Sequence, residues 1–244
     1  MTPSKADIKL IRSLDKKKSR DLNGLFIIEG EKLLEEALGA GIEVLKVFRR
    51  DNIGPELMAR ISLLSSPSPL VAIARIPFEK PFELPQQDHL YLALESINDP
   101  GNMGTIIRMA EWFGVKTVYC SPNCVDLYNP KVVQSTMGSL FRVQVSYIEL
   151  NELVVMAKKT TPIYGTFMVG KNIYHSTLPK GALVVMGNES HGISPGLEAV
   201  ISNRLHIPSF SEKTNSIESL NVAVAASIVC SEFKRSSALK SQIV

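Results

Sequence analysis

A polar loop, Glu95-Ser-Ile-Asn-Asp-Pro-Gly-Asn-Met-Gly-Thr-Ile-Ile-Arg108, joins an apolar segment at Leu90–Leu94 to the start of a helix. Asn102 is placed to cap a helix over Met103–Phe113, because a short polar side chain can accept hydrogen bonds from the first free backbone N–H groups. Arg108 points away from the main buried stripe of that helix, at the ~100° step per residue. Taken by itself, the segment indicates a turn, a cap and a surface arginine.

A second loop follows another apolar segment, Leu183–Met186, and reads Gly187-Asn-Glu-Ser-His-Gly-Ile-Ser194. Two glycines flank its polar residues, and glycine lets backbone groups approach a ligand closely. Pro195 then favours the start of a new helix. Alone this loop is weak evidence of a site, because a single histidine such as His191 is more often a surface residue than a catalytic one.

A third loop begins after Leu205-His-Ile-Pro208, and its end, Ser219-Leu-Asn-Val222, opens a helix to about Arg235. This helix is apolar almost all round and rich in small residues, which indicates burial on several faces or packing at a subunit interface. Ser219 and Asn221 lie at its start, where polar side chains serve as caps as often as they serve a function.

The rest of the chain alternates short apolar runs with helical periodicity. The predicted strands are Leu25–Ile28, Val44–Arg49, Leu70–Ile76, Leu90–Leu94, Thr117–Cys120, Arg142–Val145, Ile163–Thr166, Leu183–Met186 and Arg204–Ile207. The predicted helices are 5–20, Glu31–Leu38, Glu56–Leu64, Met103–Phe113, Pro130–Ser135, Leu150–Lys158, Pro195–Ile201 and Ser219–Arg235. This order predicts an α/β protein with a mostly parallel sheet covered by helices on both faces. Ligands in such sheets bind in the loops at the carboxyl ends of the strands.

A proline-rich passage divides the chain. Pro77, Pro81 and Pro85 fall within nine residues, and proline removes backbone donors and disfavours helix in the residue before it. We therefore predict a first domain over residues 1–76, a linker over 77–88 and a second domain over 89–244.

The net charge of the chain is only +3, but the charge is uneven. Residues 1–20 carry seven basic side chains against Asp7 and Asp15, an excess of five positive charges. Such an arm can attract phosphates, and it can equally be the solvated surface of a terminal helix. The sequence alone leaves both interpretations open.

The three cysteines, Cys120, Cys124 and Cys230, are too few and too irregular for a disulfide scaffold. No cluster of cysteine and histidine accompanies them, so we expect no metal site. The amino terminus lacks the apolar core of a signal peptide, and no run of about 18 apolar residues is present. We expect a cytoplasmic protein that does not span a membrane.

Together and in this order, the three loops resemble the motifs of the SpoU (TrmH) branch of the SPOUT RNA methyltransferases. Asn98–Arg108 resembles the first motif, whose core falls on Asn102, Gly104 and Arg108. Met186–Gly192 resembles the second, with its acidic residue at Glu189, and Ile207-Pro208 with Ser219–Val222 resembles the third. The resemblance covers residues 90–235. It is looser over residues 1–76, where Leu25–Gly30 resembles the small α/β substrate-binding domain, of ribosomal-protein type, found in members that act on ribosomal RNA.

The resemblance implies a SPOUT domain with a deep trefoil knot, although threaded loops are rare in proteins. It also implies a homodimer and S-adenosylmethionine as the cofactor. The cofactor contacts are expected at Gly187, Ile207, Leu220, Thr166 and Asn188. The catalytic set carried over is Arg108, Asn102, Glu189, Ser219 and Asn221. In this context the basic arm becomes an RNA-docking surface, with Lys16, Lys17, Lys18 and Arg20 as its contacts.

The implied reaction is methylation of a ribose 2′-hydroxyl. Because arginine holds its proton, Arg108 is expected to stabilise alkoxide charge rather than act as a base. The extra first domain favours ribosomal over transfer RNA. A non-catalytic RNA-binding protein and a methyltransferase acting on a base nitrogen are the alternatives. A dinucleotide oxidoreductase would need a Gly-x-Gly-x-x-Gly motif after its first strand, and that motif is missing. The loop over 209–218, with Glu212, Lys213 and Thr214, is longer than in many relatives and is expected to shape cofactor entry or RNA choice.

Overall fold

The computed structural model describes residues 2–78, 81–211 and 219–241. The lengthened loop is therefore described only over its first three residues, and Glu212, Lys213 and Thr214 lie outside the described residues. The chain forms two compact units. The first unit takes the described residues up to Lys80 together with Asp126–Arg142, and the second takes Pro81–Val125 and the described residues from Val143 on.

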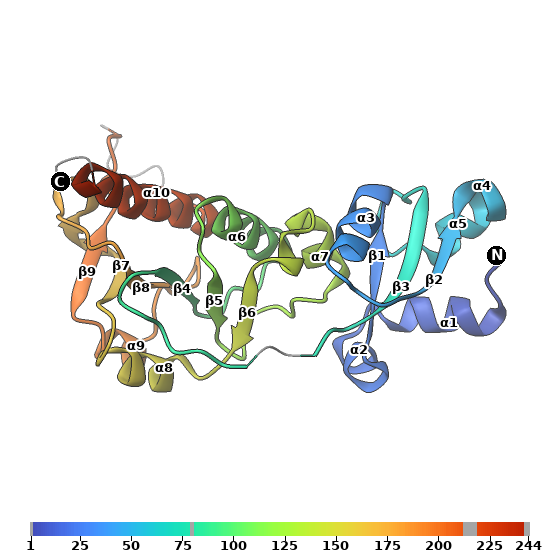
Figure 1. The fold of residues 1–244 in the computed structure, drawn as a ribbon, viewed down its shortest axis with the longest axis horizontal. Coiled ribbons are helices and arrows are strands. Elements are labelled where there is room, and N and C mark those ends of the chain that lie inside the picture. Colours follow the sequence, from blue (N-terminus) through green and yellow to red (C-terminus); the bar gives the residue numbers. More distant parts are fainter. Residues whose placement is uncertain (1, 79–80, 212–218, 242–244) are drawn as a thin grey trace. The chain divides into compact units, whose positions relative to one another are not determined.

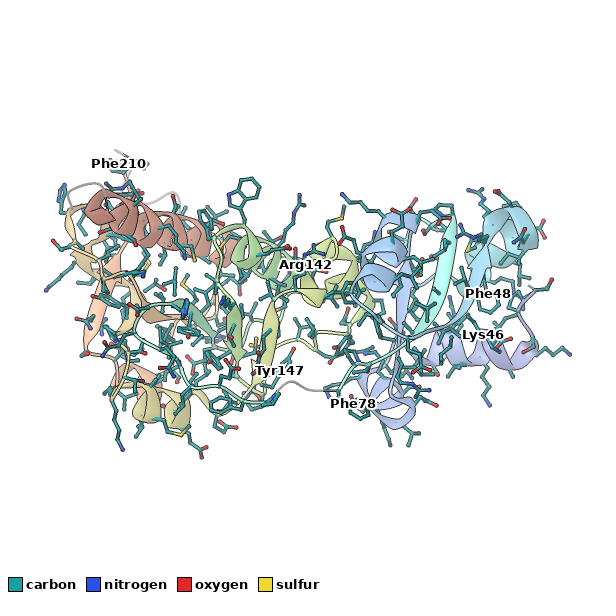
Figure 2. All side chains as sticks on the ribbon, viewed as in Figure 1. Lys46, Phe48, Phe78, Arg142, Tyr147 and Phe210 are labelled. Carbon is teal, nitrogen blue, oxygen red and sulfur yellow. The ribbon has the colours of Figure 1, made fainter. Side chains whose placement is uncertain are left out.

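The first unit is built on a three-stranded antiparallel sheet with the strand order β1-β3-β2. Its strands are β1 (Leu25–Glu29), β2 (Val44–Arg49) and β3 (Leu70–Arg75). Its helices are α1 (Lys5–Ser13), α2 (Lys17–Asn23), α3 (Glu31–Gly39), α4 (Arg50–Ile53), α5 (Pro55–Ile61) and α7 (Pro130–Thr136), with a 3-10 turn, η1 (Ser139–Phe141). Phe48 of β2, labelled in Figure 2, packs in one buried cluster with Ile11 of α1 and Met58 of α5.

The predicted helix over 5–20 is wrong as a single element, because α1 ends at Ser13 and α2 begins at Lys17. The side chain of Leu14, between them, is fully buried. The guanidinium of Arg20 donates to the carbonyl oxygens of Leu14 and Asp15, each at 2.8 Å. These carbonyls therefore find a side-chain partner where a continuous helix would have given them backbone N–H groups.

The second unit contains a six-stranded sheet with the order β6-β5-β4-β8-β7-β9, and every recorded pairing among its described residues is parallel. Its strands are β4 (Leu90–Leu94), β5 (Thr117–Cys120), β6 (Gln144–Tyr147), β7 (Ile163–Asn172), β8 (Ala182–Met186) and β9 (Asn203–His206). Its helices are α6 (Pro100–Trp112), α8 (Leu150–Ala157), α9 (Pro195–Glu198) and α10 (Val222–Ser241), with a 3-10 turn, η2 (Ile173–His175).

Helices cover both faces of this sheet. Within the second unit, α6 and α10 contact each other on one face, and α8 and α9 contact each other on the opposite face (Figure 1). Every residue of the central strands β4 and β8 is buried. The predicted α/β architecture with a mostly parallel sheet is confirmed.

Residues Asp126–Arg142, assigned by the sequence analysis to the second domain, pack with the first unit. The ring of Phe26 in β1 lies 5.0 Å from that of Tyr128 and 6.5 Å from that of Phe141, centroid to centroid. The strand predicted at Arg142–Val145 begins later than expected, because Arg142 also packs with the first unit. Arg142 forms an ion pair with Glu36 of α3, so β6 begins only at Gln144.

Candidate active site at the carboxyl ends of the parallel strands

The three motif loops leave the sheet at the same edge. Strands β4 and β8 are parallel neighbours in which Leu94 pairs with Met186, so the loops after them start side by side. The loop after β9 starts at the carboxyl end of another parallel strand of that sheet. Parallel strands bring loops that are distant in sequence to one edge, where ligands bind.

Helix α6 begins earlier than predicted. Asp99, not Asn102, is its N-cap, and the Asp99 carboxylate accepts a hydrogen bond from the backbone N–H of Asn102 at 2.7 Å. Pro100 occupies the first helical position, where its missing N–H costs nothing. The expectation that Asn102 caps the helix is therefore wrong, and its side chain is free for other partners.

Those partners are the second and third motifs. The Asn102 side-chain N–H donates to the carboxylate of Glu189 in the loop after β8. The Asn102 side-chain oxygen accepts from the amide of Asn221 at 2.8 Å. Asn221 is also the cap of α10, because its oxygen accepts from the N–H of Ala223 at 2.9 Å. In the sequence, Glu189 lies 87 residues after Asn102, and Asn221 lies 119 residues after it. The three side chains form one continuous hydrogen-bonded chain.

A second set of contacts ties the loop after β8 to the loop after β4. The side-chain N–H of Asn188 donates to the carbonyl of Ser96 at 2.8 Å. Ser194 donates to the Glu95 carboxylate through both its backbone N–H, at 2.8 Å, and its hydroxyl, at 2.6 Å. Glu95 and Ser194 were not predicted as site residues, since neither spacing nor composition distinguishes them from ordinary loop residues.

The loop after β8 is tightly folded at Gly187. A Cβ atom on Gly187 would lie 2.2 Å from the backbone of Gly192, so no other residue fits there without a backbone shift. Asn188 and Gly192 exchange backbone hydrogen bonds at 2.8 and 3.0 Å, which close the loop on itself. The two glycines noted in the sequence therefore serve this close approach.

Cys124 holds the loop after β4 in place. Its Sγ accepts a hydrogen bond from the N–H of Ile97 at 3.3 Å, and Ser121 accepts one from Ser96 at 2.9 Å. The hydrogen bond with Cys120 is the largest cause that lowers the pKa of Cys124 to about 7. The Cys124 Sγ also donates to the carbonyl of Leu94 at 3.2 Å, so the sulfur ties the start of this loop to the end of β4. From the sequence these cysteines were considered only for disulfides and metal binding, so this role was not predicted.

Arg108 and Ser219 stand apart from the hydrogen-bonded chain. Both side chains are exposed, and neither makes a recorded hydrogen bond with the described residues. Arg108 lies about 9 Å along the axis of α6 from Asn102, at 1.5 Å per residue. An exposed guanidinium beside a polar loop cluster can meet an anionic or developing negative group of a bound substrate.

Three of the five residues expected to hold the cofactor have free backbone groups. Gly187, Ile207 and Leu220 make no recorded hydrogen bond, backbone or side-chain, with the described residues. Gly187 and Ile207 are half-buried, and polar backbone groups in such positions need a partner. Thr166 is half-buried and donates to the carbonyl of Val185 at 3.4 Å. The residues present therefore fit a ligand that is bound largely by backbone groups.

The basic residues expected to contact RNA divide into two kinds. Lys16, Lys17 and Lys18 are exposed, and Lys17 pairs with Asp21 at 2.7 Å. Arg20 is only 2% exposed and pairs with Asp126 at 2.5 Å. The expectation for Arg20 is therefore wrong, because its guanidinium is buried and already bound to a carboxylate and two carbonyls.

Across the parts of the chain that the structure describes, there is no group of three or more histidine, cysteine, aspartate or glutamate residues that could hold a metal ion. None of the helices described is both long and apolar enough to cross a membrane.

Comparison with known proteins places both units. The SpoU rRNA methylase family model matches residues 89–231, and a model described as the MRM3-like substrate binding domain matches residues 5–75. The chain is 28% identical over 236 residues to the 23S rRNA guanosine 2′-O-methyltransferase RlmP of Bacillus subtilis, covering 89% of this chain and 92% of RlmP.

Solved structures agree with this assignment. The chain is 36% identical to a Porphyromonas gingivalis protein described as a TrmH-family RNA methyltransferase, with a TM-score of 0.81 and coverage of 96% of this chain and 98% of that one. It is 25% identical to an rRNA methyltransferase of Sinorhizobium meliloti solved with S-adenosylmethionine bound, with a TM-score of 0.84 and coverage of 96% and 97%. With a matching family model over more than half of its length, the chain belongs to the SpoU rRNA methylase family.

Proposed function

We propose that this chain is an S-adenosylmethionine-dependent methyltransferase that methylates a ribose 2′-hydroxyl of RNA in the cytoplasm, with ribosomal rather than transfer RNA as its substrate. The observation that carries the proposal is the hydrogen-bonded chain Asn102–Glu189–Asn221, which joins the three family motifs at one edge of the sheet. RlmP, named for 2′-O-methylation of 23S rRNA, supports the choice of reaction and of RNA.

The cofactor is expected at the free backbone groups of Gly187, Ile207 and Leu220. Thr166 and Asn188 complete the expected contacts. S-adenosylmethionine, when bound, supplies an electrophilic methyl group, so the protein's own task is to orient the ribose and manage its proton. We also propose that the second unit contains the deep trefoil knot that the resemblance implies.

Arg108 is proposed to stabilise negative charge as the 2′-oxygen loses its proton. Arginine keeps its own proton in proteins, so it is suited to this electrostatic role and poorly suited to act as a base. Asn102 and Glu189 act as positioning residues, because the carboxylate fixes the amide that faces the third loop. Asn221 holds that loop at the start of α10, and Ser219 is proposed as a second positioning residue of the same loop.

The first unit is proposed to dock RNA through the exposed lysines Lys16, Lys17 and Lys18. The match of residues 5–75 to a substrate-binding domain supports this role. Phosphate contacts of this kind make affinity fall as salt rises.

A homodimer is proposed to form through α6 and α10. Trp112 of α6 is 85% exposed and Val224 of α10 is 49% exposed, and the two helices contact each other. Large apolar side chains exposed on adjoining helices are typical of a surface that another chain covers.

Two measurements on the full chain test the proposed activity. Isothermal titration calorimetry with S-adenosylmethionine is expected to show binding to the free protein. Nucleoside analysis of ribosomal RNA incubated with the protein and cofactor is expected to show a 2′-O-methylated nucleoside. RNA binding without cofactor binding would instead identify a non-catalytic RNA-binding protein, and a methylated base would identify a base-nitrogen methyltransferase.

A further inference from the structure

A cavity of about 500 Å³ lies in the second unit, beside strands β7 and β9. It is enclosed by the start of β7 at Tyr164, the segment from Lys171 to Leu178, and β9 from Asn203 to Leu205. None of its lining residues belongs to the expected catalytic or cofactor set. Its volume is within the range of about 300–1,000 Å³ that small-molecule sites in proteins occupy.

The rim of this cavity is basic. Its basic lining residues are Lys171, His175 and Arg204, and none of the described residues that line it is acidic. Lys171 and His175 are exposed and make no recorded ion pair with the described residues. Arg204 is held in place, because its guanidinium pairs with Glu198 and lies 3.7 Å from the centroid of the Phe167 ring. Lys171 therefore supplies a positive charge that is free to meet an anion, and the His175 ring offers an N–H group that can donate to it.

Tyr164 is the aromatic residue that lines the cavity. It is half-buried, and its ring packs edge-on against that of Phe233, with centroids 5.3 Å apart. Leu178 and Leu205 are 1% and 2% exposed, so they pack behind the cavity wall and hold it in place. The Tyr164 ring therefore offers a firmly held aromatic surface that suits the flat, weakly polar face of a nucleobase.

Two asparagine side chains line the cavity, and each keeps one hydrogen-bonding group that is not used within the described residues. The Asn203 side chain uses its N–H on the carbonyl of Ile163 at 2.8 Å, which leaves its oxygen as an acceptor. The Asn172 side chain uses its oxygen on the N–H of Tyr174 at 2.9 Å, which leaves its N–H group as a donor. One acceptor and one donor can recognise the hydrogen-bonding edge of a base.

We propose that this cavity binds a nucleotide, with the phosphate at Lys171 and His175 and the base on the Tyr164 ring. A phosphate-bearing nucleotide can come from two sources, a free mononucleotide or a nucleotide of the RNA that lies outside the methylated position. The RNA source rests on the proposed function, whereas the affinity of the cavity for a nucleotide does not.

The direct test is calorimetric titration of the full chain with each of the four ribonucleoside monophosphates. S-adenosylmethionine is present at saturation, so that binding at the cofactor site does not contribute. At least one monophosphate is expected to bind, and the Lys171→Ala/His175→Ala variant is expected to weaken it about tenfold or more. The matched control, Lys159→Ala/His89→Ala, removes the same residue types from exposed positions outside the cavity and is expected to leave affinity unchanged.

The proposal is overturned if no monophosphate binds, if both double variants weaken binding equally, or if the cavity variant changes only the oligomeric state. Circular dichroism establishes that the variants fold, and Lys171→Arg, which keeps the charge, is expected to retain binding.

Steady-state kinetics of RNA methylation by the wild type and the same variants distinguish the two sources of the nucleotide. An RNA nucleotide predicts a raised KM for RNA with unchanged kcat in the cavity variant, and competition by the monophosphate. A free nucleotide predicts an unchanged KM. Failure of the proposed function would abolish methylation in the wild-type chain while leaving monophosphate binding intact, so the two failures are distinguishable.

Discussion

The side chain of Arg108 in the first motif is exposed and has no recorded partner among the described residues. We expect Arg108→Ala to lower kcat by about 100-fold, as removal of a charge-stabilising donor typically does. Cofactor affinity, measured by calorimetry, is expected to stay within about twofold, because the cofactor contacts lie on other loops. Turnover near the wild-type rate would show that the charge on the 2′-oxygen is stabilised by another group. Arg12→Ala, at an exposed arginine of α1, is the control.

Arg20 acts through stability rather than through RNA. Its removal leaves Asp126, itself only 16% exposed, without its cation. Breaking a buried ion pair on one side costs about 3 kcal/mol or more, so chemical denaturation of Arg20→Ala is expected to show a loss of that size. Lys17→Ala breaks the exposed pair with Asp21 and is expected to cost less than about 1 kcal/mol. Equal losses in the two variants would contradict this assignment.

Glu29 makes the stability of the first unit depend on pH. It is 4% exposed, and burial raises the pKa of its carboxyl above the ordinary value, although Ser62 and the Leu63 N–H donate to it at 2.6 Å. A raised folded-state pKa stabilises the fold below the unfolded-state pKa, and that contribution is lost as pH rises through the folded-state value. Wild-type protein is therefore expected to lose stability relative to Glu29→Gln between pH 4 and pH 7.

Urea denaturation of both proteins at the two pH values measures this difference. The exposed carboxylate of Glu43, paired with Arg75 at the surface, provides the control variant Glu43→Gln. A difference between wild type and Glu29→Gln that is the same at both pH values would show that Glu29 does not titrate in this range.

Among the elements, helix α6 has its N-cap at one end and carries proposed catalytic residues along its length. Asp99 caps the helix and Asn102 lies in its first turn, so a frayed first turn would move the Asn102 amide away from Glu189. Asp99→Ala is expected to cost about 1 kcal/mol, and to lower Tm by about 2–4 °C in a chain of this size. Turnover is expected to fall as well. Asn129→Ala, which removes the cap of α7, should lower Tm similarly but spare turnover.

Apolar periodicity is sufficient to predict the bounds of some elements and fails for others. The bounds of β4 and β5 are the predicted ones, because short buried apolar runs bounded by polar loops leave little choice. Helices α1 and α2 were predicted as one because both are amphipathic and no proline or glycine separates them. The break between them depends on Arg20, whose position is set by Asp126, 106 residues away.

For the whole molecule, the proposed homodimer gives a prediction that a single tryptophan makes easy to follow. Trp112 is the only tryptophan of the chain. If α6 and α10 form the interface, dilution should shift its emission to longer wavelength as dimers dissociate. Val224→Glu places a charge in that interface and is expected to weaken the dimer about tenfold or more in sedimentation velocity. Leu22→Glu, at a leucine of α2 that is 83% exposed, is expected to leave the dimer intact.

The α/β class, the parallel sheet, the place of the proline-rich division and the order of the three motifs can all be predicted from the amino-acid sequence. These signals are local, because apolar periodicity and the positions of glycine and proline can be recognised within about ten to twenty residues. Tertiary structure alone decided that Asn102 bonds to Glu189 and Asn221, that Arg20 is buried, and that Asp126–Arg142 packs with the first unit. The physical reason is that a side chain's partner depends on which strands become neighbours. Sheet order brings together residues 87 and 119 positions apart, and no local pattern records that choice.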